Sequence, residues 1–199
     1  MEVRVKVCGL TRLSDVIAAA EAGADMLGFV KEPSSPRFVP DAHPLSAYHA
    51  YAPFIPFCGV FGPFRTGVPI HAFSHIQSID PCPPELRKRW MRVVPVSPDD
   101  TLESLGKRIQ GEGVVVLDRA SAAHGGTGET IDWGLARDLV AKFSHVKFVL
   151  AGGLGPDNVA EAVRRVRPYA VDASSRLESG PGEKDAEKVR AFVEAAKGA

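Results

Sequence analysis

The residues best suited to chemistry lie near the end of the chain, after two consecutive apolar segments. Gly152 and Gly153 follow the first segment, and Ser174 and Ser175 follow the second. Glycines let backbone N–H groups approach an anion closely, and the start of a following helix adds positive potential. Pro156 is expected at the first position of that helix, where its missing N–H is tolerated. We interpret the two segments as one phosphate site, although a Gly-Gly pair also occurs in ordinary tight turns.

Three further residues could bind or transfer protons on a substrate. A Cys8 thiolate can take up a proton, and the Asp132 carboxyl group can donate one if its pKa is raised. Taken alone, Cys8 also fits a small buried hydrophobe, and Asp132 also fits the N-cap of the next helix. Arg37 is the one guanidinium of its loop and also fits an ordinary surface arginine. Other polar candidates at the ends of expected strands are Gln77, Asp118 and Asp172.

Eight short apolar segments recur along the chain and read as buried strands. Most are separated by helix-like segments, and this alternation indicates a parallel sheet with helical crossovers. The count of eight, with a phosphate site after the last two strands, favours an α/β fold of the (β/α)8 TIM barrel type as a single domain over residues 1–199. A doubly wound open sheet is the alternative. The expected strands cover residues 2–8, 24–30, 55–61, 73–79, 90–96, 114–118, 148–150 and 170–173.

The expected helices differ in length, and one connection lacks room for a helix. Residues 62–72 are rich in Gly and Pro and fall short of the dozen or so residues that a crossover needs, so helix 3 should be missing or shortened. Thr11 or Ser14 should cap the first helix. Ser97 or Asp99 should cap the helix after the fifth strand. The expected helices cover residues 13–22, 40–51, 84–89, 99–110, 132–143, 156–166 and 184–197, with a loop at 179–182.

The composition excludes several classes of function. The chain has 199 residues, 45% of them hydrophobic, which is enough for one globular domain. Lys and Arg number 24 and so do Asp and Glu, so no basic field draws nucleic acid or an acidic membrane. No apolar run approaches the ~18 residues of a membrane span, and the N-terminus lacks a signal-peptide pattern. Three scattered cysteines indicate a reducing cytoplasm, and the six histidines lack metal-site spacing.

Short motifs occur in one order along nearly the whole chain. They are residues 6–11 (KVCGLT), 22–25 (AGAD), 28–29 (GF), 35–37 (SPR), 125–128 (GGTG), 131–133 (IDW), 150–154 (LAGGL), 158–159 (NV), 171–175 (VDASS), 181–182 (PG) and 184–185 (KD). No single motif is specific, but the combination is. In this combination the chain resembles the phosphoribosylanthranilate isomerase family of tryptophan biosynthesis.

The resemblance implies an Amadori rearrangement of N-(5-phosphoribosyl)anthranilate that needs no cofactor and no metal. Asp132 matches the family's general acid and would protonate the ring oxygen, while Cys8 matches the general base and would remove the proton from sugar C2. Arg37 would hold the anthranilate carboxylate. This small molecule would be the partner of a cytoplasmic monomer or homodimer. The other substrate-binding positions are Gln77, Asp172 near the sugar hydroxyls, and Gly152, Gly153, Ser174 and Ser175 at the phosphate.

The chain departs from the family's pattern at three places. Residues 77–80 read QSID where the family has Gln-Leu-His-Gly, so the histidine and glycine are missing. Arg176 stands where the family has the glycine of Ser-Ser-Gly, and residues 62–64 (GPF) replace an asparagine-containing loop. Two alternative functions stay open: a related isomerase of histidine biosynthesis and a phosphate-binding barrel without catalysis. The histidine-pathway relative has aspartate where Cys8 stands, which favours the tryptophan pathway.

Overall fold

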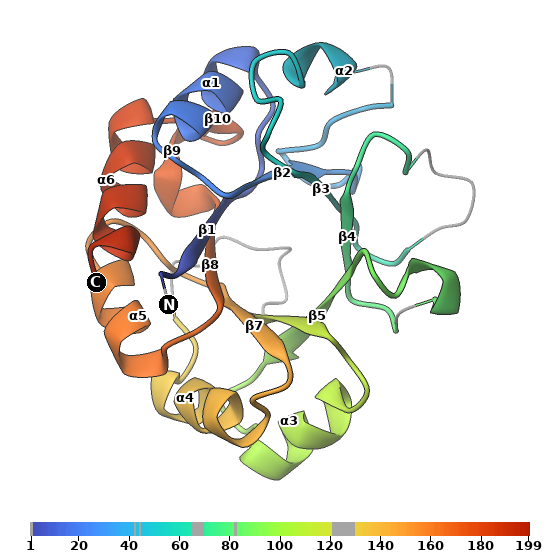
Figure 1. Ribbon diagram of the computed structural model, residues 1–199, viewed down its shortest axis with the longest axis vertical. Coiled ribbons are helices and arrows are strands. Elements are labelled where there is room, and N and C mark those ends of the chain that lie inside the picture. Colours follow the sequence, from blue (N-terminus) through green and yellow to red (C-terminus); the bar gives the residue numbers. More distant parts are fainter. Residues whose placement is uncertain (1, 42, 44, 65–69, 82, 121–129) are drawn as a thin grey trace.

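A computed structural model describes residues 2–41, 43, 45–64, 70–81, 83–120 and 130–199, and its centre is a closed barrel of parallel strands (Figure 1). The strands follow one another around the barrel in sequence order, and β8 returns to pair with β1. This confirms the (β/α)8 barrel and excludes the open sheet. The strands are β1 Arg4–Val7, β2 Met26–Val30, β3 Phe57–Val60, β4 His75–Ser78, β5 Trp90–Val96, β6 Val114–Arg119, β7 Lys147–Leu150 and β8 Ala170–Ala173.

Helices cover the strands unevenly. The α-helices are α1 Leu13–Glu21, α2 Leu45–Tyr48, α3 Leu102–Ile109, α4 Trp133–Lys142, α5 Val159–Val166 and α6 Ala186–Lys197, and the 3-10 turns are η1 Pro84–Leu86 and η2 Ser175–Leu177. Figure 1 shows α1, α6, α5, α4 and α3 as an arc around the strands. Between β3 and β4 the described residues contain no helix, as expected, and residues 65–69 lie outside them. No helix in the described part of the chain is long and apolar enough to cross a membrane.

Two helices are shorter than the sequence pattern predicted. The helix expected over residues 40–51 covers only α2, because the chain tightens after Tyr48 into turns in which Ala50 N donates to Ala47 O and Tyr51 N to Tyr48 O. The helix after β7 begins at Val159, so Pro156 precedes α5 and does not open it. Asn158 explains this, since its Oδ1 accepts a hydrogen bond from Gly155 N at 2.9 Å and closes a separate turn before the helix.

The expected N-caps were wrong for two helices. The N-cap of α1 is Arg12, whose side chain makes no capping hydrogen bond, because Thr11 Oγ1 donates instead to Gly182 O at 2.6 Å. The N-cap of α3 is Thr101, which forms a reciprocal capping box with Ser104. A Thr followed three residues later by a residue that can reach back is the stronger N-terminal signal.

Alternation along the strands separates two sets of buried side chains. Outward residues such as Val5, Val7 and Leu150 pack beneath the helices in the main core. A smaller cluster fills the barrel interior, made of Cys58, Met91, Val116, Val149, Ala151 and Ala170. The same alternation turns Lys6 and Asp172 inward, where Nζ and Oδ2 lie 2.7 Å apart as a buried ion pair. The next inward positions, toward the carboxyl ends of the strands, are therefore free to line a site.

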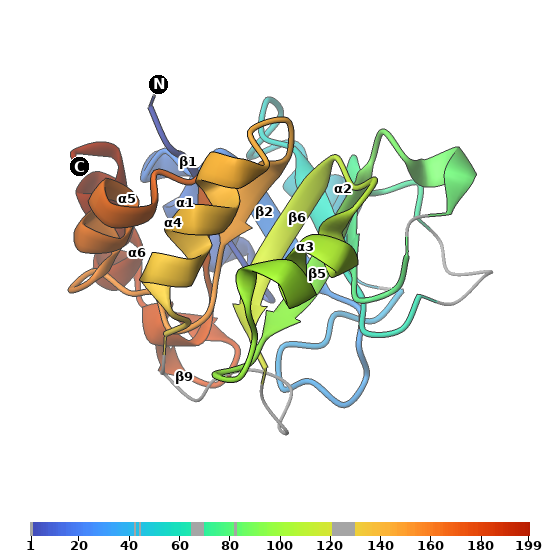
Figure 2. The same cartoon turned by 90° about the horizontal axis from the view of Figure 1, so that it is seen from below.

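A short antiparallel hairpin follows β8 where a plain loop was expected over residues 179–182. Its strands are β9 Glu178–Gly180 and β10 Glu183–Lys184, and they leave less chain for α6, which starts at Ala186 behind the capping side chain of Asp185. In Figure 2, β9 lies at the opposite end of the barrel from the two chain termini. The hairpin therefore lies at the carboxyl ends of the strands, on the same side as the candidate functional residues.

Candidate active site

A cavity of about 520 Å³ opens at the carboxyl ends of the strands. Its size is typical of small-molecule sites, and this end of a barrel is where reactive residues lie. The inward alternation of the strands and the loops that follow them bring most of the predicted site residues onto its wall. These are Cys8, Arg37, Gln77, Gly152, Gly153, Asp172, Ser174 and Ser175.

Cys8 follows β1 on the inward side and is only 7% exposed. Burial raises the pKa of its thiol, while the nearby Lys6 ammonium acts to lower it. Gly28 on β2 makes room for the sulfur, because a Cβ atom there would lie 2.9 Å from Cys8 Sγ. The thiol is therefore a fixed part of the wall, and it ionises readily only if a further positive charge comes close.

Arg37 reaches the cavity from the loop between β2 and α2. Its side chain crosses Gly9, where a Cβ atom would lie 2.6 Å from Arg37 Cδ. Its Nε and Nη2 donate to the two carboxylate oxygens of Glu178, each at 2.7 Å, and this interaction raises the pKa of the guanidinium. Nη1 has no hydrogen-bond partner among the described residues. The Arg37 guanidinium is therefore fixed by Glu178, and its Nη1 side can still bind an anion.

The two predicted phosphate segments lie on one side of the cavity. Gly152 and Gly153 both have a left-handed backbone conformation, with φ of 80° and 66°, which residues other than glycine rarely adopt. The Gly153 carbonyl oxygen accepts hydrogen bonds from Asn158 Nδ2 at 3.0 Å and Arg176 Nη1 at 2.9 Å. These contacts fix the loop. Arg176, where the family has glycine, lines the cavity and also pairs with Asp157, its Nη2 lying 2.8 Å from Oδ2.

Two buried acceptors on the cavity wall lack partners. Asp172 Oδ1 and Gln77 Oε1 make no hydrogen bond among the residues described, whereas Asp172 Oδ2 is held by Lys6. Buried acceptors without donors are unfavourable, so a ligand that brings hydroxyl or N–H groups would be bound here. Asp172 raises the pKa of Lys6 although burial alone would lower it, so Lys6 stays charged at neutral pH.

The structure does not bring Asp132 to the cavity. Its Oδ1 caps α4, accepting from Gly134 N at 2.7 Å and Leu135 N at 3.2 Å, and the residue is exposed. Asp132 is therefore the N-cap of α4 in the structure, as the alternative interpretation predicted. The glycine-rich motif over residues 125–128 lies outside the described residues. Asp118 at the end of β6 lines the wall instead, and burial raises the pKa of its carboxyl group to about 6.

Comparison with known proteins decides the family. A family model described as N-(5'phosphoribosyl)anthranilate (PRA) isomerase matches residues 85–195. The N-(5'-phosphoribosyl)anthranilate isomerase of Pseudomonas putida (strain GB-1) is 38% identical, with 98% of each chain covered. The chain belongs to the phosphoribosylanthranilate isomerase family. The sequence resemblance is thereby confirmed at the level of the family.

Solved phosphoribosylanthranilate isomerases share the fold. The crystal structure from Thermotoga maritima has a TM-score of 0.80 and 30% identity, covering 99% of this chain and 100% of its own. A second crystal structure, a complex with reduced 1-(o-carboxyphenylamino)-1-deoxyribulose 5-phosphate, has a TM-score of 0.76 and 28% identity over 99% of this chain and 100% of its own. The family's barrel and this one therefore agree over their full lengths.

Sequence reasoning missed one pair of residues beside the site. Glu178 and Lys184 on the β9–β10 hairpin lie behind Arg37 and Ser174, and neither was singled out for a role. The available signal was the concentration of charge in the loop after β8, next to the Pro-Gly and Lys-Asp motifs. Local patterns do not show that this charge is buried, because its burial depends on contacts with distant parts of the chain.

Proposed function

We propose that this chain is a phosphoribosylanthranilate isomerase that converts N-(5-phosphoribosyl)anthranilate to 1-(2-carboxyphenylamino)-1-deoxyribulose 5-phosphate. The observation that carries the proposal is the full-length family similarity combined with one cavity that holds a thiol, a guanidinium and a phosphate cradle. The substrate carries a carboxylate at one end and a phosphate at the other, matching the two anion sites. As a biosynthetic enzyme it would act in the cytoplasm as a monomer or homodimer.

The wall offers a partner for each polar part of the substrate. The phosphate would bind backbone N–H groups at Gly152 and Gly153 and the hydroxyls of Ser174 and Ser175, next to the start of α5. The anthranilate carboxylate would bind the free edge of Arg37, because a planar guanidinium matches a carboxylate. Sugar hydroxyls would donate to the unpaired oxygens of Asp172 and Gln77. Both ends of the substrate would thus be fixed before any proton moves.

The reaction needs an acid for ring opening, a base at C2 and a final tautomerisation, and it needs no external oxidant or reductant. An acid protonates the ring oxygen, the C1–O bond breaks, and the nitrogen lone pair forms a C1=N iminium. The positive iminium makes the proton on C2 acidic and also lowers the pKa of the adjacent Cys8 thiol. After the thiol has released its proton to solvent, the thiolate takes the C2 proton. The electron pair of the C2–H bond then forms the C1=C2 bond of an enolamine, and the C1=N pair returns to the nitrogen. Tautomerisation then places the carbonyl at C2 and a proton at C1, so substrate and product are isomers.

The ring-opening acid is proposed to be Asp132, on its match to the family position. This role requires the start of α4 to approach the cavity when substrate binds. Asp118 is the second candidate, favoured because it already lines the cavity and has a pKa of about 6. A carboxyl group with such a pKa is partly protonated near neutral pH and can donate a proton.

A fluorescence assay tests the proposed function. Anthranilate fluorescence is followed while the purified chain consumes freshly prepared N-(5-phosphoribosyl)anthranilate. We expect saturable turnover at rates of about 1–10³ per second. Turnover only of the histidine-pathway substrate would favour the related isomerase. Binding of the reduced product analogue without turnover of either substrate would favour a non-catalytic phosphate-binding barrel.

A further inference from the structure

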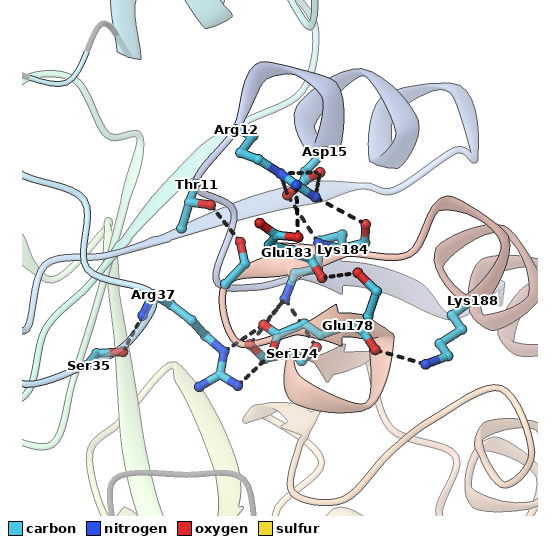
Figure 3. A network of polar contacts seen from close by, with 12 residues as sticks. Thr11, Arg12, Asp15, Ser35, Arg37, Ser174, Glu178, Glu183, Lys184 and Lys188 are labelled. Atoms are coloured by element: carbon cyan, nitrogen blue, oxygen red, sulfur yellow. Dashed lines mark hydrogen bonds and ion pairs between the residues drawn. The ribbon is translucent and has the colours of Figure 1, made fainter.

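Arg37, Glu178 and Lys184 form a cluster of largely buried charges beside Ser174 (Figure 3). Arg37 clamps both oxygens of Glu178 at 2.7 Å. Lys184 Nζ donates to Glu178 Oε1 at 2.8 Å, and also to the carbonyl oxygen and Oγ of Ser174 at 3.1 and 3.4 Å. The Glu178–Lys184 pair therefore joins the arginine of the β2–α2 loop to the serine that follows β8.

The charges in this cluster do not cancel. The Glu178 side chain is 5% exposed and the Lys184 side chain 0% exposed, so both need partners. Burial alone would raise the pKa of Glu178, but hydrogen bonds from Arg37 and Lys184 bring it below its usual value, and the carboxylate stays ionised. Burial lowers the pKa of Lys184, and the contact with Glu178 acts against this shift. While Lys184 is charged, two cations face one anion, which leaves one positive charge in excess. Only Arg37 of the three lines the cavity, so the excess charge is presented there.

The hairpin that carries Glu178 and Lys184 is itself anchored to the barrel. Thr11 Oγ1 donates to Gly182 O at 2.6 Å, and Lys184 N donates to Asp15 Oδ2 at 3.2 Å. Lys188 Nζ, from α6, donates to Glu178 O at 2.8 Å. The backbone of the pair is thus held from both α1 and α6, and the cluster is a fixed support and not a mobile bridge.

We propose that Glu178 and Lys184 are positioning residues that set the orientation of Arg37 and its distance from Ser174, and hence the spacing between carboxylate and phosphate sites. The inference rests on the proposed function. An arginine side chain has many rotamers, and holding Nε and Nη2 in advance removes the ordering that binding would otherwise require. A displacement of ~1 Å at such a site can cost on the order of 10²-fold in rate.

Glu178→Gln tests the clamp, with Glu183→Gln as its matched control on the same hairpin. Glu183 pairs with Arg12 and its side chain is 58% exposed, so its loss leaves the cavity unchanged. Two probes are titrated: the reduced product analogue and the same compound made with aniline in place of anthranilate. We expect Glu178→Gln to raise the Kd of the carboxylate-bearing probe by about 10- to 100-fold and the Kd of the aniline probe by less than about threefold. Glu183→Gln should leave both unchanged.

Equal weakening of both probes by Glu178→Gln would overturn the inference, because a merely structural role disturbs the whole cavity. If Glu178→Gln does not fold, Glu178→Asp keeps the charge with a shorter reach and should show the same preference for the carboxylate-bearing probe in a smaller degree. Lys184→Met removes the contacts to Ser174 and should weaken binding of both probes, because both carry the phosphate, and it should also weaken inhibition by inorganic phosphate. Failure of the proposed function is distinct, since the wild-type chain would then not turn over the substrate, whether or not it binds the probes.

Discussion

Replacing Asp132 by asparagine separates the two roles that its position allows. In the structure its Oδ1 accepts from Gly134 N and Leu135 N, and the exposed side chain is not on the cavity wall. Asparagine offers a carbonyl oxygen in the same place but no acidic proton. Asp132→Asn therefore keeps the cap of α4 and removes only the acid.

The two roles predict effects of different size on different quantities. Asparagine and aspartate cap helices about equally well, so Asp132→Asn should change the free energy of unfolding by less than about 0.5 kcal/mol. Asp132→Ala loses both capping hydrogen bonds and should cost ~1 kcal/mol, a fall in Tm of about 2–4 °C for a chain of this size. Loss of a general acid lowers kcat by roughly 10²–10⁴-fold in either variant.

The assay is anthranilate fluorescence across the pH range, with thermal unfolding measured on the same samples. If Asp132 is the acid, Asp132→Asn loses turnover at wild-type Tm, and the basic limb of its pH–rate profile flattens. Turnover within about threefold of wild type, well short of the loss typical for an acid, would refute the reasoning. Asp118→Asn, assayed in parallel, should then carry the loss instead.

Other substitutions test the remaining roles. Cys8→Ser keeps the shape but offers a hydroxyl that does not ionise readily, so kcat should fall about 10²–10⁴-fold in a folded protein; near-normal turnover would remove Cys8 from the mechanism. Arg37→Lys keeps the charge but loses the planar pair of donors that fits a carboxylate, so KM should rise about tenfold or more. Removing the carboxylate from the substrate should then raise KM little further in the variant. If removal of the carboxylate raises KM equally in the wild type and in Arg37→Lys, Arg37 does not bind that group. Burial raises the pKa of Asp118 from 3.8 to about 6, so its ionisation costs folding stability progressively as the pH rises from 3.8 to about 6, and in full above that range. Asp118→Asn should therefore stabilise the protein by at most ~3 kcal/mol at pH 8 and by nothing near pH 3, as urea unfolding at both pH values would show.

The barrel could be predicted from the sequence because its strands are short, apolar and regularly spaced. The bounds of β5 match the expected residues, because the strand is a short apolar segment with a break on either side. The helix over residues 40–51 was too long because apolar spacing does not reveal a competing turn. Pro156 was assigned to a helix start by its residue type, but the side chain of Asn158 closes a turn that local propensity does not specify.

The site was predictable where it depends on strand ends and not where it depends on distant contacts. Cys8, Gln77 and Asp172 follow from inward alternation, and the cavity brings them together. The environment of Asp132 could not be inferred, because capping and catalysis both favour aspartate at that position. The partnership of Arg37 with Glu178 joins residues 141 positions apart, and no local pattern reports such a contact.

The ion pair between Lys6 and Asp172 has a consequence for how the chain assembles. The two residues are 166 positions apart, on the first and last strands, and they meet only where the barrel closes. Until β8 arrives, Lys6 would carry an unpaired charge into an apolar interior, which is strongly unfavourable. In a fragment that ends before Asp172, β1 would therefore stay exposed to water, because burial of Lys6 without its partner is unfavourable. Closure of the ring becomes an all-or-none event that awaits the C-terminal quarter of the chain, so ribosome-bound intermediates would expose the first strand until synthesis is nearly complete.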